Sequence, residues 1–101
     1  MISLILLAGI IADWNGTWAG NWKHGDGIQI IMAGNVATGI FLHGDYLPDD
    51  LRASVSPDGK TLTIRWGGSN AVLKRDTATT AHIAIHESGH ADAAFAVTRD
   101  P

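Results

Sequence analysis

Hydrophobic residues alternate with polar ones through most of the chain, and turn residues interrupt this alternation roughly every ten residues. A period of two places one set of side chains on each face of a β-strand. Regularly spaced turns between such segments are typical of an antiparallel meander. The pattern predicts about eight short strands, over residues 14–22, 28–32, 36–43, 51–55, 62–66, 71–75, 79–86 and 91–99.

The first of these segments has an unusual composition. Three of the four tryptophans and two glycines occupy every second residue, namely Trp14, Gly16, Trp18, Gly20 and Trp22. Two glycines, at about 1 kcal/mol each, make the segment a poor helix former, so we expect a strand with three indoles on one face. Such a strand suits a closed or strongly curved β core in which glycine allows the backbone to bend.

The most clearly marked hairpin lies around Pro57-Asp58-Gly59-Lys60, where proline fixes φ and Asp-Gly supplies a tight corner. Because the connections are too short for parallel crossovers, we expect up-and-down order. A barrel closes at about eight strands, around an interior that side chains or one small ligand can fill. The predicted fold is therefore all-β, a small antiparallel up-and-down meander or barrel.

Composition limits the possible functions. A chain of 101 residues is long enough for one core, and we expect residues 13–101 to form a single domain. The net charge of -3 gives no basic footprint, so we expect no nucleic-acid partner. The absence of cysteine excludes disulfides and thiolate chemistry, and a single glutamate offers little acid–base machinery. We therefore expect no cofactor and a non-enzymatic protein.

Residues 1–12 (MISLILLAGIIA) form an uncharged apolar segment. It has the length of a signal-peptide core and is far shorter than the ~20 residues that cross a bilayer, so we expect no stable membrane span. An export signal would make the protein periplasmic or secreted. The alternatives are a hydrophobic N-terminal strand or a misassigned start codon, either of which leaves a cytoplasmic location open.

A possible metal motif lies near the end of the chain. His86-Glu87-Ser88-Gly89-His90 satisfies H-E-x-x-H, and the surrounding IAIHESGHADAAFAV resembles the active-site helix of ATP-dependent membrane metalloproteases. On a helix, His86 and His90 would bind one zinc ion with Glu87 as general base. A third ligand is needed, and only Asp92 and Asp100 follow as candidates.

The same segment also fits a hairpin, with apolar alternation before and after a turn at 87–90. In a strand, His82 and His86 would lie about 13 Å apart and could not share a metal ion. We therefore expect the hairpin and no metal site. A minimal zinc metallohydrolase that uses His86, Glu87 and His90 is the alternative function.

Gly16-Thr17-Trp18 resembles the G-x-W signature of the calycin superfamily, which contains the lipocalins, fatty-acid-binding proteins and avidins. In those barrels, the tryptophan of the first strand packs at the closed end against a basic residue of the last strand. The resemblance implies this pairing for Trp18 and Arg99. The chain is also similar to small bacterial proteins of unassigned role that begin G-T-W-x-G-x-W and end in Arg-Asp.

These observations predict a non-enzymatic, calycin-like β-barrel of the cell envelope that binds a small apolar ligand or a protein partner. Ligand sites are mostly apolar with a few polar anchors. The candidate ligand-binding residues are Trp22, Phe41, Tyr46 and Trp66. Core packing is the alternative role for the tryptophans, and a purely structural interface module is a third class of function.

Overall fold

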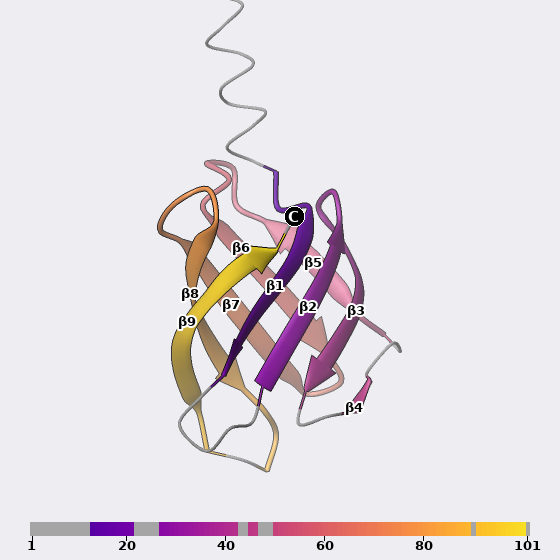
Figure 1. Cartoon of the computed structure of the whole chain (residues 1–101). Coiled ribbons are helices and arrows are strands. Elements are labelled where there is room, and N and C mark those ends of the chain that lie inside the picture. The colour runs from indigo at the N-terminus through magenta and orange to yellow at the C-terminus, as the bar shows by residue number, and fades with distance from the viewer. Residues whose placement is uncertain (1–12, 22–26, 43–44, 47–49, 90, 101) are drawn as a thin grey trace, which may run out of the picture.

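The computed structural model describes residues 13–21, 27–42, 45–46, 50–89 and 91–100, which form an all-β barrel-shaped sheet (Figure 1). Every strand pairing is antiparallel. The strands are β1 (Gly16–Asn21), β2 (Gly27–Ala33), β3 (Val36–Leu42), β4 (Asp45–Tyr46), β5 (Arg52–Val55), β6 (Thr61–Trp66), β7 (Ser69–Arg75), β8 (Thr80–His86) and β9 (Ala93–Asp100). Within these ranges no helix is long and apolar enough to cross a membrane.

The eight predicted strands are confirmed, with small shifts of their ends. β1 begins at Gly16 rather than Trp14, because the Asn15 amide donates to Asp13 Oδ1 (2.8 Å) in a local turn that holds Trp14 outside the ladder. β9 covers 93–100 rather than 91–99. β4 is a short ninth strand inside a segment that we expected to be a loose connection.

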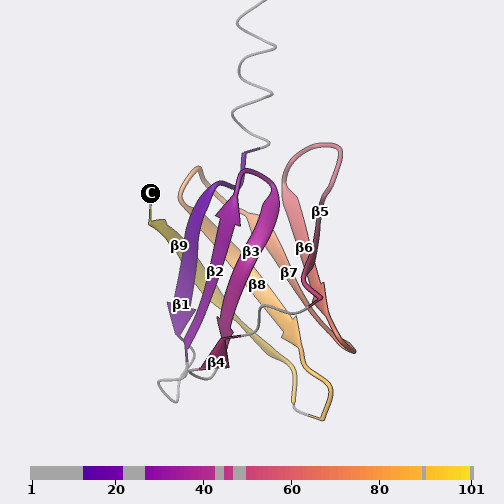
Figure 2. The same ribbon diagram turned by 90° about the vertical axis from the view of Figure 1, so that its right-hand side faces the viewer.

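The meander closes on itself because β1 pairs with both β2 and β9. The order across the sheet is β4-β3-β2-β1-β9-β8-β7-β6-β5, so the predicted up-and-down topology is confirmed. The two ends of the sheet meet where β3 and β5 lie next to each other without forming a ladder (Figure 2). We call this line between β3 and β5 the seam.

The interior is filled by apolar side chains from alternate positions. The alternate apolar residues of β2, β6 and β8 face inward and are all buried. The complete buried set is Trp14, Trp18, Ile28, Ile30, Met32, Ile40, Leu42, Leu62, Ile64, Trp66, Ala71, Leu73, Ala81, Ile83, Ile85 and Val97. Each fully buried large side chain contributes about 1.5–3 kcal/mol relative to an exposed one. Side chains that border the seam, such as Ala37, Ala53 and Val55, are only partly buried.

Gly20 allows β1 and β9 to approach each other closely. A Cβ atom at this position would lie 2.4 Å from the Ala96 carbonyl oxygen and 2.9 Å from Val97 Cγ1. The ladder between the two strands covers Thr17 to Ala19 and ends just before this glycine. The position therefore requires a residue without a side chain, because β9 lies close to it, a role different from the backbone bend predicted for glycine in this strand.

We expect Gly20→Ala to lower the free energy of unfolding by about 1–3 kcal/mol, because the new methyl group meets backbone that cannot move freely. Urea unfolding followed by tryptophan fluorescence measures the change. Gly68→Ala is the matched control, since a Cβ atom there meets only Ser88 Cβ at 3.9 Å. Equal losses for the two variants would contradict the steric explanation.

The turn between β5 and β6 is held by Asp58. Its Oδ1 accepts hydrogen bonds from Ser56 Oγ (2.6 Å) and from the Lys60 amide (3.0 Å). Both bonds lower the pKa of Asp58 below its ordinary value, and the bond from Ser56 has the larger effect. The predicted Asp-Gly corner is thus stabilised by the charged form of the aspartate.

A lowered folded-state pKa means that Asp58 stabilises the protein above its unfolded-state pKa and loses this contribution as the pH falls through the folded value. We therefore expect Asp58→Asn to be less stable than the parent protein at pH 7. The difference between their urea midpoints should shrink as the pH falls below 3.8, the ordinary value of this group. A difference that does not change with pH would contradict this account.

Candidate functional site

The residues predicted to contact a ligand lie on different sides of the barrel wall. Trp66 ends β6 with its side chain in the core, only 8% exposed, whereas Phe41 lies on the outer face of β3 and is 37% exposed. Tyr46 pairs with Phe41 in the short ladder between β3 and β4. The Tyr46 side chain and the whole of Trp22 lie outside the described residues. Trp66 and Phe41 therefore do not share one site.

Two tryptophans and two arginines close the upper end of the barrel. The rings of Trp14 and Trp18 lie 5.0 Å apart, and their indole N–H groups donate to the carbonyl oxygens of Gly59 and Trp14 respectively, each at 3.0 Å. The Arg99 guanidinium lies 5.3 Å from the Trp18 ring. The contact between Trp18 and Arg99 that the resemblance implied is therefore present.

Arg75 is the second cation of this cluster, and the sequence analysis missed it. Its guanidinium lies 4.8 Å from the Trp14 ring and 5.1 Å from the Trp18 ring, within range of a cation–π interaction. The alternation along β7 could have placed Arg75 on the inward face with Ala71 and Leu73, but it does not indicate which rings the guanidinium contacts.

The electrostatic environment of Arg75 indicates a structural role. Burial, and then the charge of Arg99, lower its pKa below the ordinary value. The guanidinium compensates by donating to the carbonyl oxygens of Asp13 (2.6 Å) and Ala78 (2.8 Å). Since these donors are directed at the chain's own backbone, the cluster closes the barrel end and fixes the residues that precede β1.

We expect Arg75→Ala to lower the free energy of unfolding by about 1–3 kcal/mol, because the carbonyl groups lose charged donors. Lys74→Ala is the matched control. Lys74 is an exposed neighbour on the other face of β7, and its loss should change stability by less than about 0.5 kcal/mol. Urea unfolding of both variants tests this, and equal effects would argue against the closing role of Arg75.

The HESGH segment forms a strand end and a turn over its described residues, so the predicted hairpin is confirmed. His86 is the last residue of β8, and Gly89 has a φ of +84° in the turn. His86 Nδ1 forms a hydrogen bond with Asp92 Oδ1 at 2.8 Å across this turn. His82, inside β8, forms a similar hydrogen bond with Asp76, which lies in the turn before that strand. His90 lies outside the described residues.

The hydrolase alternative requires His86 on a helix one turn before its second histidine. The strand ending at His86 does not provide that helix. Within the described part of the chain, no group of three potential metal ligands comes together. No observation at this position therefore favours the hydrolase.

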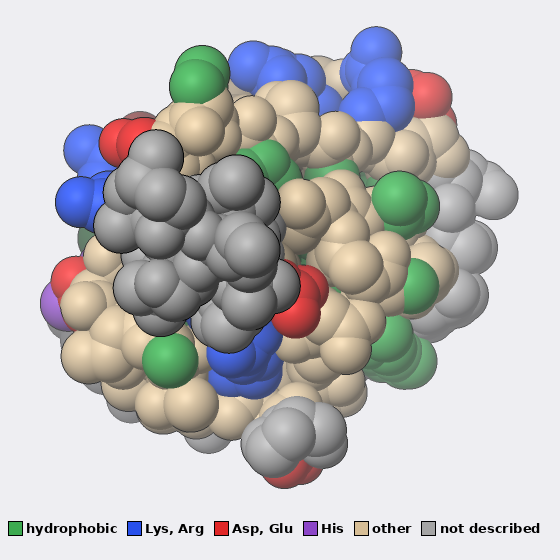
Figure 3. Space-filling model, turned by 90° about the horizontal axis from the view of Figure 1, so that it is seen from above, with side chains coloured by type: hydrophobic (Ala, Val, Ile, Leu, Met, Phe, Trp, Pro, Cys, Tyr) green, Lys and Arg blue, Asp and Glu red, His purple; other side chains and the backbone are tan. Residues whose placement is uncertain are grey.

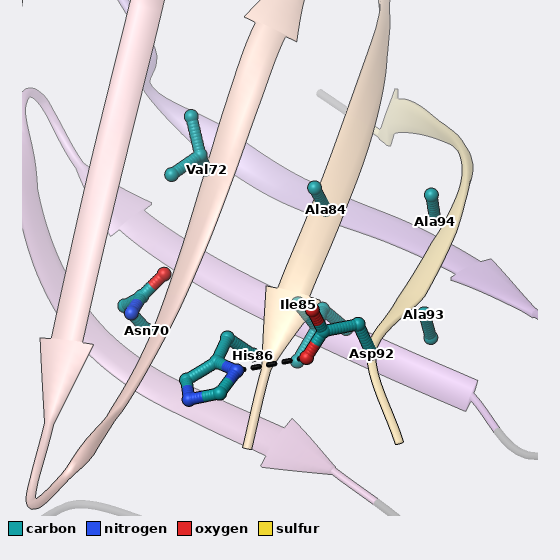
Figure 4. Close-up of a pocket in the computed structure, with 8 residues that line it drawn as sticks. All are labelled: Asn70, Val72, Ala84, Ile85, His86, Asp92, Ala93 and Ala94. Carbon is teal, nitrogen blue, oxygen red and sulfur yellow. Dashed lines mark hydrogen bonds and ion pairs between the residues drawn. The ribbon is translucent and has the colours of Figure 1, made fainter. Parts of the chain in front are cut away.

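A hollow of about 230 Å³ lies on the outer face of β7, β8 and β9, beside the His86–Asp92 pair (Figure 4). In the close-up, the His86 ring lies between Asn70 and Asp92, and small apolar side chains form a row above these three. The lining residues are Asn70, Val72, Ala84, Ile85, His86, Asp92, Ala93 and Ala94. An apolar floor with a few polar groups at one end can accept a compact ligand.

The outer surface of the barrel is divided by charge. β1, β2 and β3 contain no charged residue. We call their outward-facing residues the uncharged face, which includes Thr17, Ala19, Gln29, Ile31, Val36 and Phe41. The charged residues of β5, β6 and β7 are all basic, namely Arg52, Arg65, Lys74 and Arg75. Viewed from above, Lys and Arg side chains gather along the side of β5–β7, and hydrophobic side chains show on the side of β3 (Figure 3).

Comparison with models of protein families, with curated proteins and with solved structures finds no match for this chain. The resemblance to calycins therefore stays an expectation.

Proposed function

We propose that the protein is a non-enzymatic binding module of the cell envelope and that another protein docks on its uncharged face. The observation that carries this proposal is the exposure of Phe41 (37%) and Val36 (64%) on strands without a charged residue. Interface cores are depleted of charge and enriched in aromatic residues. An exposed apolar patch on a sheet is a common mark of a protein-binding surface.

The packing of the core supports an external site. The inward side chains of β2, β6 and β8 are almost completely buried against one another, so the described interior is occupied by the protein's own atoms. A ligand inside the barrel would have to displace them. The small-apolar-ligand version of the function is therefore weaker than the protein-partner version.

The uncharged face ends at the seam, on β3. β3 pairs with β4 only through Phe41 and Leu42, so its remaining length borders the seam without a second ladder among the described residues. The apolar segment 1–12 supports a location in the envelope.

To test the proposal, a photoreactive benzoylphenylalanine replaces Phe41 in the full chain, which is then irradiated in living cells. We expect a covalent product with a partner protein in the envelope fraction, because the aromatic ring at this position lies in the interface. A product that disappears with Val36→Asp would support docking on the uncharged face.

The same photoreactive residue at Lys74, on the basic side of the barrel, is the matched control. No product from position 41, or the same set of products from both positions, would argue against a specific partner on the uncharged face. Recovery of the chain only from the cytoplasmic fraction would overturn the proposed location.

A further inference from the structure

Four outward-facing polar side chains lie in one row across β5, β6, β7 and β8. The strand register pairs Arg52 with Arg65, Arg65 with Asn70, and Asn70 with His86. Neighbouring strands are about 4.8 Å apart, so the row is roughly 14 Å long at the backbone. We call these four residues the polar row. It lies on the outer face of β5–β8, whereas the uncharged face lies on β1–β3.

Among the described residues, the two arginines of the polar row have little negative charge close to them. Like charges directly opposite each other destabilise a strand pair. Arg52 has only a long contact with Asp50 (3.9 Å), and both of these side chains are more than 60% exposed (64% and 65%). Among the described residues, no carboxylate forms an ion pair with Arg65. A bound anion between the guanidinium groups would remove this repulsion and accept their paired donors.

The adjacent row provides a surface of matching chemistry. Its register runs from Ser54 to Thr63, Val72, Ala84 and Ala94. Two hydroxyl groups therefore flank the arginines, and three apolar side chains follow toward β9. Val72, Ala84 and Ala94 also line the hollow of about 230 Å³, with Asn70 and His86 at its lower side.

We propose that this surface binds a small molecule with an anionic head, a phosphate or a carboxylate, joined to a compact apolar body. The head lies against Arg52 and Arg65 with the nearby hydroxyl groups, and the body covers Val72 and the alanines. Asn70 lies between the two parts and donates to the ligand.

The acidic residues at the two ends of the site limit the length of the ligand and set the orientation in which it binds. Asp92 bonds to His86 Nδ1 (2.8 Å) and carries negative charge at the β9 end of the hollow, so an anionic head is favoured at the arginine end. Asp50 lies beyond Arg52 at the other end. With a carboxylate at each end and a net charge of -3, the chain disfavours long polyanions such as nucleic acid.

The experiment uses the ¹⁵N-labelled full chain and titrates it with phenyl phosphate, inorganic phosphate and phenol, which represent the whole ligand, the head and the body. We expect saturable amide shifts at Arg65, Asn70 and His86 with phenyl phosphate, and weaker binding of either fragment alone. Benzoate is titrated in parallel, and saturable binding at the same amides supports the carboxylate form of the head.

Arg65→Gln should weaken the binding of phenyl phosphate by about tenfold or more, because a charge-assisted pair of donors is lost. Arg52→Gln, on the neighbouring strand, gives a second and independent test. Lys74→Gln is the matched control, since it also removes one positive charge from the outer face. Lys74 lies about 13 Å along β7 from Asn70, the residue that pairs with Arg65. This substitution should change the dissociation constant by less than about twofold, because exposed charges at that distance are screened.

Three results would overturn the proposal. These are shifts that do not saturate with phenyl phosphate or benzoate, shifts located mainly away from the polar row, and an equal loss of affinity in Lys74→Gln and Arg65→Gln. Far-UV circular dichroism and the urea midpoint of each variant confirm that its fold is intact. Because the photocrosslinking test concerns residues of β3 and not those of the polar row, either proposal can fail without the other.

Discussion

The pairing of β1 with β9 is the constraint on which the rest of the structure depends. Three residue pairs, from Thr17↔Asp100 to Ala19↔Thr98, join the beginning of the meander to its end. Without this ladder the chain would form an open sheet, and the apolar side chains that now fill the interior would be exposed to solvent. Gly20 permits the close approach, and Trp18 and Arg99 stack where the two strands meet.

Closure of the barrel has a direct consequence for function. Because the inward positions carry large apolar side chains, the volume that a wider barrel would offer to a ligand is occupied by the core. The two proposed binding sites therefore lie on the outer surface, whose two sides differ in chemistry. The side of β1–β3 is uncharged and exposes Phe41, whereas the side of β5–β8 carries the polar row. One small scaffold therefore presents two different surfaces.

The distance along the chain between interacting residues decides which features of the structure could be predicted from the sequence. Alternation and turn residues reflect interactions between residues close in sequence. The strand at 62–66, the turn at Asp58 and the hairpin around HESGH could therefore be predicted. The contact of Trp18 with Arg99 was implied by a resemblance. The role of Arg75 was missed because its partner Trp14 is distant in sequence.

The sequence by itself determined which residues form strands and which of their side chains point inward, because both follow from a period of two along one segment. Only the tertiary structure decided which strands are neighbours and in what register. That register brings Arg52 into one row with His86, and it places Arg75 over the rings of Trp14 and Trp18. These juxtapositions depend on the closure of the whole barrel, so no local pattern in the chain encodes them.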